Sequence, residues 1–126
     1  MRYSEAMRLG AMASGQAFYK LCDEAGNTCA QGAVLLARGI TDFREGRAWM
    51  RPDIQDFVQF LKTDAICPVR SERNYVCNII AFLNNDQRWS RERIADWVAT
   101  IEPREEPRPE TVQVEPSLAT DLAQVR

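Results

Sequence analysis

Four cysteines are the residues of this sequence whose type is best suited to metal or nucleophilic chemistry. They are Cys22, Cys29, Cys67 and Cys77, and the chain contains no histidine. The absence of histidine excludes Ser-His-Asp catalysis, Cys-His catalysis and HExxH metal binding. Cys22 and Cys29 stand farther apart than the knuckle of about 2–4 residues that presents two thiolates to zinc. We therefore expect neither a metal nor another cofactor, and Cys77, within the apolar run YVCNII, to be a small core residue.

Carboxylate pairs and glycines give no catalytic pattern. Asp53 with Asp56, and Glu92 with Asp96, have the spacing of neighbours on a helix surface, where general acid or base work would require a partly desolvated pocket. The six glycines are scattered and form no phosphate-binding loop. These patterns identify no catalytic residue and favour a non-enzymatic chain, and a catalytic site of Cys, Asp or Glu assembled by the fold stays open as the alternative.

Arginines gather around one tryptophan in the second half of the chain. Such residues can bind phosphates or an acidic protein when they share a surface. The alternative explanation of this cluster is a preference for arginine over lysine throughout the chain, because 14 of the 16 basic residues are Arg. The candidate partner-binding residues are Arg70, Arg73, Arg88, Trp89, Arg91 and Arg93.

Charge and composition divide the chain into a body and a tail. Residues 1–101 carry 13 basic and 12 acidic side chains, so the body is balanced and has no general attraction for nucleic acid. Residues 102–126 carry 3 basic and 6 acidic side chains together with four prolines. This composition buries too little apolar surface to offset chain entropy, so we expect a disordered, acidic, Pro-rich tail.

Hydrophobic periodicity predicts a mostly α fold, a compact bundle of about four to five short helices. The strongest repeats begin after Pro52 and after Ser90, which suit the first turn and the N-cap of a helix. The predicted helices are Tyr3–Met12, a helix capped by Thr28 that runs to Arg38, one from Pro52 to Leu61, one from about Ser71 to Leu83, and one from Ser90 to Ile101. The predicted core residues are Ile54, Phe57, Val58, Leu61, Ile79, Phe82, Leu83, Ile94, Trp97, Val98 and Ile101.

The N-terminal segment lacks the features of a secretory signal, because residues 1–18 contain no long apolar run between a basic start and a cleavage site. No stretch approaches the roughly 20 apolar residues that span a bilayer. We therefore expect a cytoplasmic chain with reduced thiols and no membrane partner.

Two segments resemble a group of small uncharacterised proteins encoded by phages, prophages and bacteria. YSEAMRLGAM at residues 3–12 and TCAQGA at residues 28–33 resemble that group's "SEAIRLGAM" and "TCALGAA" segments. Cys67-Pro68, followed by IIAFLNNDQRWSRERIADWVATIEP at residues 79–103, resembles the ending "CPxC…HLNDxHxWxREQIADWVxxxEP". A looser similarity connects the chain to periplasmic immunity proteins of the Rap/Tai type, which differ in cysteine register.

The resemblance implies a metal site in the family and its loss here. The ligands of the family's site would be a CxxC pair and two histidines. In this chain the four positions are occupied by Cys67, Arg70, Phe82 and Gln87. Only Cys67 keeps a metal-ligating type, so we expect the fold to persist without metal and Phe82 to pack where a ligand would lie. Asn84 and Trp89 also match the family pattern, and we expect them to end one helix and to fix the turn before the next.

The resemblance and the absence of catalytic patterns favour a non-enzymatic, phage- or prophage-associated interaction protein. We expect it to bind a host or phage protein and to modulate host machinery or a host-defence complex. Two alternatives stay open. One is a nucleic-acid-associated helical module that uses the arginines and Trp89, and the other is a small structural component of the virion.

Overall fold

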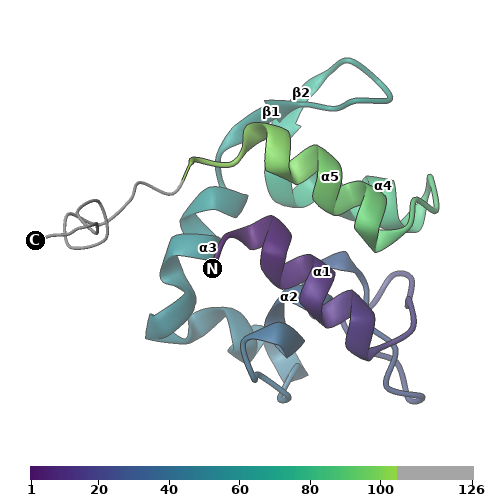
Figure 1. The fold of residues 1–126 in the computed structure, drawn as a ribbon, viewed down its shortest axis with the longest axis vertical. Helices are drawn as coiled ribbons and strands as arrows, with labels where there is room; N and C mark the ends of the chain where they lie inside the picture. Colours follow the sequence, from purple (N-terminus) through teal and green to yellow (C-terminus); the bar gives the residue numbers. More distant parts are fainter. Residues whose placement is uncertain (105–126) are drawn as a thin grey trace, which may run out of the picture.

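A computed structural model describes residues 1–104 of the chain, apart from the side chains of residues 44–46 (Figure 1). It confirms a mostly helical fold, to which a two-stranded antiparallel sheet is added. The predicted tail lies outside the described residues from position 105 onward. No helix within residues 1–104 is long and apolar enough to cross a bilayer. In chain order the elements are α1 (Tyr3–Ala13), α2 (Ala30–Ala37), the 3₁₀ helices η1 (Arg44–Met50) and η2 (Pro52–Ile54), α3 (Gln55–Leu61), β1 (Asp64–Ile66), β2 (Arg73–Tyr75), α4 (Val76–Asn85) and α5 (Arg91–Ile101).

Most predicted helices lie within a few residues of their expected positions. Ser90 caps α5, because its hydroxyl accepts the N–H of Arg93 at 3.1 Å. Pro52 begins a short 3₁₀ turn that runs directly into α3. The predicted cap of α2 was wrong by one residue, since the Cys29 sulfur accepts the N–H of Gly32 at 3.4 Å. Thr28 is instead buried, with its hydroxyl 2.8 Å from that of Ser14.

The predicted start of the fourth helix, near Ser71, was wrong. α4 begins at Val76, and residues 73–75 form β2, which pairs with β1 so that Asp64 lies opposite Tyr75 and Ile66 opposite Arg73. Ser71 takes a left-handed conformation, with φ 59°, in the turn between the strands. Strands of three residues show too short an alternation to be separated from the apolar pattern of the helix that follows them.

The core lies between the helices and includes most of the predicted residues. Seven of the eleven are buried, whereas Val58, Phe82, Trp97 and Ile101 are half-buried. The first helix contributes more than predicted: Tyr3 and Met7 are buried, and Tyr3 contacts the ring of Phe57 edge-on at 5.2 Å between centroids. The helices α1 and α2 pack backbone to backbone at Gly10, where an added Cβ would lie 1.8 Å from the Ala33 carbonyl oxygen.

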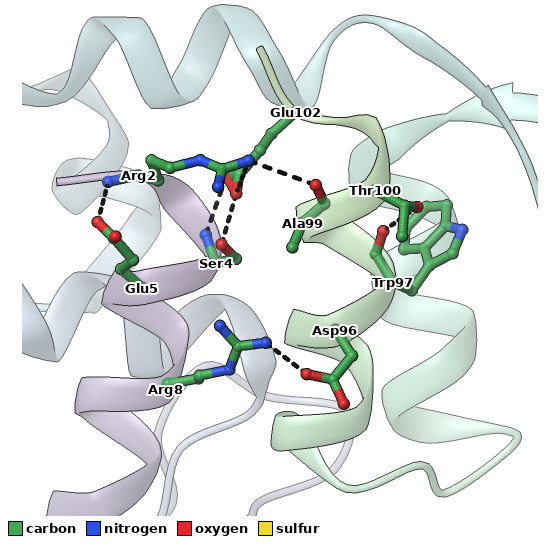
Figure 2. A network of polar contacts seen from close by, with 9 residues as sticks. All are labelled: Arg2, Ser4, Glu5, Arg8, Asp96, Trp97, Ala99, Thr100 and Glu102. Atoms are coloured by element: carbon green, nitrogen blue, oxygen red, sulfur yellow. Dashed lines mark hydrogen bonds and ion pairs between the residues drawn. The ribbon is translucent and has the colours of Figure 1, made fainter. Parts of the chain in front are cut away.

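Polar contacts join the first and last helices along their length (Figure 2). Glu102, the first residue of the predicted tail, is buried instead, and it accepts hydrogen bonds from the N–H and the hydroxyl of Ser4. Its other partner is Arg2, whose Nη2 lies 3.1 Å from the Glu102 carboxylate. Farther along the helices, Arg8 pairs with Asp96. These contacts show that α1 and α5 run antiparallel and that the packed body includes Glu102.

Candidate binding surface

Three of the candidate arginines lie against aromatic rings around the C-terminal half of α4 and the turn that follows it. The guanidinium carbon lies 4.3 Å from the ring centroid of Phe82 for Arg70, 3.9 Å from that of Phe18 for Arg88, and 3.7 Å from that of Trp89 for Arg93. Distances this short place each cation over the face of its ring. We call these six residues the stacked-arginine surface.

The turn between α4 and α5 positions Arg88. The N–H of Trp89 donates to the carbonyl oxygen of Leu83 at 2.9 Å and so closes the end of α4. Arg88, just before it, takes a left-handed conformation with φ 56°. This conformation is more usual for glycine, because a Cβ in it costs about 1–2 kcal/mol. Arg88 is therefore held in a strained conformation at the point where its side chain reaches Phe18.

We expect the substitution Arg88→Gly to change the free energy of unfolding by no more than about 1 kcal/mol, because relief of the backbone strain offsets both the lost ring contact and the greater freedom of glycine in the unfolded chain. Urea denaturation followed by circular dichroism measures this difference. Arg88→Ala, which keeps the strain and loses the contact, is expected to be less stable than Arg88→Gly. The opposite order would contradict this account of the turn.

The loop that carries Phe18 is anchored to the same turn. The Gln16 side-chain amide donates to the Trp89 carbonyl oxygen at 2.8 Å and to Asn84 Oδ1 at 3.0 Å. Tyr19 donates its N–H to the Asn85 side chain and its hydroxyl to the carboxylate of Asp86. These bonds fix the ring on which Arg88 rests.

Asn84 lies one residue before the end of α4, close to the helix end predicted for it, and its side chain also connects the elements of this arrangement. It is 2% exposed, and its Oδ1 also accepts the N–H of Ala30 at 3.0 Å. Its Nδ2 donates to the carbonyl oxygen of Ala17 and to the Asn85 side chain. The burial of Asn84 could have been predicted from its spacing from Ile80. Residues four apart share a helix face, and Ile80 lies on the buried face of α4.

Arg91 does not belong to the surface, which corrects its inclusion among the binding residues. It is 6% exposed, and its guanidinium donates to the carbonyl oxygens of Ala11 and Ser14 at the end of α1. It also donates to the hydroxyls of Ser14 and Thr28, each at 3.0 Å. Burial lowers the pKa of Arg91, and the nearby Glu92 opposes this shift. Its role is to join α5 to the end of α1.

Arg73 lies apart from the ring contacts, exposed on β2 across from Ile66. Within residues 1–104, Arg70, Arg73, Arg88 and Arg93 form no ion pair, whereas Arg2, Arg8 and Arg51 do. The four unpaired guanidinium groups therefore keep hydrogen-bond donors for an external acceptor.

The positions that the resemblance assigns to metal ligands come together but cannot hold a metal. Cys67 and Arg70 share the hairpin turn, Arg70 covers Phe82, and the Gln87 N–H donates to the Phe82 carbonyl oxygen at 3.1 Å. A guanidinium and a phenyl ring supply no ligand. Across the described residues, no three Cys, Asp or Glu side chains gather as a metal site.

A pocket of about 210 Å³ lies beside the loop that carries Phe18. Its walls include Tyr19, Leu21, Cys29 and Ile80. Burial raises the pKa of the Cys29 thiol, and hydrogen bonds from nearby backbone N–H groups only partly oppose this. Cys29 is therefore a protonated thiol at neutral pH, which is the unreactive form.

Comparisons of the chain with protein-family models, curated proteins and solved structures found no match.

Proposed function

We propose that this protein is a non-enzymatic binding protein that holds an acidic segment of a partner protein on the stacked-arginine surface. The observation that carries the proposal is that Arg70, Arg88 and Arg93 each lie over a ring and form no ion pair within the described residues. A ring holds the guanidinium plane in place, so less side-chain entropy is lost when a carboxylate binds its edge. Hydrogen bonds between a guanidinium and a carboxylate are among the stronger ones in proteins.

The ring contacts favour an acidic protein over nucleic acid. Proteins that bind single strands stack bases on aromatic faces. Here Phe18, Phe82 and Trp89 are half-buried, and each has a guanidinium over one face. The net charge of −2 adds no general attraction for phosphates.

The biological setting that we propose is a phage or prophage, with the protein acting in the host cytoplasm on a host protein or host-defence complex. The support for this setting is the resemblance of residues 3–12, 28–33, 67–68 and 79–103 to phage and prophage sequences. A place in the virion is the competing assignment, and detection of the protein in purified particles would favour it.

The test is affinity purification of the tagged full chain from its bacterial host, with mass spectrometry of the co-purifying proteins. We expect one stoichiometric partner that survives nuclease treatment. The double variant Arg88→Gly, Arg93→Gln is expected to bind this partner at least about tenfold more weakly, because a hydrogen bond to a charged group contributes about 1.5–3 kcal/mol. The affinity of the unchanged chain is expected to fall as salt is added.

The matched control is Arg51→Gln, which removes an exposed arginine whose partner is Asp53 and which lies outside the stacked-arginine surface. This variant is expected to bind the partner as the unchanged chain does. Equal affinity of the double variant and the unchanged chain would refute the surface. Partners that disappear with nuclease would replace the proposal with nucleic-acid binding.

A further inference from the structure

The β1–β2 hairpin lies on the outside of the fold and packs against α4 (Figure 1). Backbone bonds from Cys67 N–H to the oxygen of Glu72 and from Val76 N–H to the oxygen of Thr63 flank its three residue pairs. Because hydrogen-bonded and non-bonded pairs alternate in an antiparallel ladder, the pair Asp64–Tyr75 is non-bonded, and so is Ile66–Arg73. The N–H and C=O groups of these four residues therefore point away from the partner strand.

The two edges of the hairpin differ in what meets these groups. On β2, the Asn74 side-chain oxygen accepts the outward N–H of Tyr75 at 2.7 Å and is itself held by the Asn78 side chain at 3.0 Å. On β1, the outward N–H and C=O groups of Asp64 and Ile66 have no hydrogen-bond partner within residues 1–104. Both outward-facing residues of β1 are thus open to a further strand, whereas on β2 the N–H of Tyr75 is occupied and only Arg73 has no backbone hydrogen-bond partner in the described residues.

Apolar side chains surround this open edge. Ala65 faces the core, so Ile66 and Tyr75 share the outer face of the hairpin, where they are 48% and 54% exposed. Val69, in the turn, is 42% exposed. Arg73, across from Ile66 on the same face, is exposed and forms no ion pair in the described part of the chain.

We propose that the β1 edge takes a short extended segment of a partner protein as a third, antiparallel strand. The inference builds on the proposed function, that the chain binds a protein, and adds a second point of contact and its mode. Main-chain hydrogen bonds from Asp64 and Ile66 would hold the segment, and alternate side chains would give selectivity.

The outer face of the hairpin defines the sequence that fits. The residue opposite Ile66 is apolar and β-branched, and the residue opposite Asp64 is basic, since like charges across a ladder repel. In the bound segment, a carboxylate two residues before the apolar position lies on the same face of the sheet. It lies toward the hairpin turn and within reach of Arg73. The pattern is therefore Glu-x-Val-x-Lys.

A second copy of the chain fits this edge less well. Two β1 strands paired about Ala65 would place Asp64 of each copy opposite Ile66 of the other. That arrangement puts a carboxylate beside an isoleucine on the outer face, where neither gains a suitable neighbour. The mixed apolar and charged character of the edge favours a different chain.

The experiment is an NMR titration of the ¹⁵N-labelled full chain with the peptide acetyl-Glu-Thr-Val-Thr-Lys-amide at millimolar concentration. We expect the amide signals of Asp64 and Ile66 to shift the most and the amide signal of Tyr75 to shift little. N-methylation of the peptide's valine removes an N–H that points at β1 and is expected to abolish binding. N-methylation of the threonine that follows it alters an N–H that points away and is expected to leave binding unchanged.

Three outcomes overturn the inference. Equal binding of the two methylated peptides excludes strand pairing, and the absence of any shift excludes the site. Concentration-dependent shifts of Asp64 and Ile66 without peptide, with a doubled mass in solution, assign the edge to a second copy.

Because the double variant Arg88→Gly, Arg93→Gln leaves β1 intact, weaker partner capture by that variant together with unchanged peptide binding shows that the two sites act separately. Failure of the peptide alone therefore leaves the proposed function standing.

Discussion

Replacement of Arg91 by methionine is expected to lower the free energy of unfolding by about 3–5 kcal/mol, because several buried acceptors lose their donor at a cost of about 1–3 kcal/mol each. The acceptors are the carbonyl oxygen of Ala11 and the carbonyl and hydroxyl oxygens of Ser14 and Thr28. Methionine fills much of the volume of arginine but donates no hydrogen bond. Urea denaturation monitored by circular dichroism measures the loss.

The matched control is Arg93→Met, two residues farther along α5. Arg93 is exposed, and its guanidinium lies over Trp89. We expect this variant to lose no more than about 1 kcal/mol, which is the upper value for an exposed cation–π contact. If both variants lost the same free energy, Arg91 would have no special place in joining α1 to α5.

The substitution Gly10→Ala is expected to destabilise the protein by about 3 kcal/mol or more, although alanine is the better helix former by about 1 kcal/mol. The added Cβ would lie 1.8 Å from the Ala33 carbonyl oxygen and 2.8 Å from its Cα. Both are backbone atoms of α2, so no side chain can rotate away and the two helices must separate. A thermal melt of the variant measures the loss.

Met12→Ala in the same helix serves as its control. Met12 is 82% exposed, so its truncation removes little packing and is expected to change stability by no more than about 0.5 kcal/mol. An unchanged melting temperature for Gly10→Ala would show that α1 and α2 do not pack at this point.

The sequence predicts those elements whose signals are local. α5 has a cap at Ser90 and apolar residues at Ile94, Trp97, Val98 and Ile101, so its start and its buried face follow from spacing alone. The hairpin could not be predicted in the same way, because its strands have three residues each and are held by a turn whose left-handed residue is Ser71 rather than glycine.

The exposed arginines around Trp89 could be predicted from the sequence, whereas the burial of Arg91 could not be predicted from their clustering. In the sequence Arg91 stands between Arg88 and Arg93, so its charge and its arginine neighbours suggest a surface residue. Its spacing suggests otherwise, because Ile94 and Val98 follow it by three and seven residues and are both buried. The acceptors that make its burial tolerable come from α1 and the residues that precede α2, far away in the sequence, and only the tertiary structure shows them.

The contact between the first and last helices has a consequence for the order in which the nascent chain folds. Ser4 and Glu102 are 98 residues apart, and Arg2 and Ala99 are 97 apart, so α1 leaves the ribosome long before its partner has been synthesised. Until then the buried face of α1 lacks the cover of α5, and loop closure over almost the whole described chain must precede the final contacts. Folding is therefore completed late, after α5 emerges, and until then the face of α1 that α5 covers is open to chaperones or to misfolding.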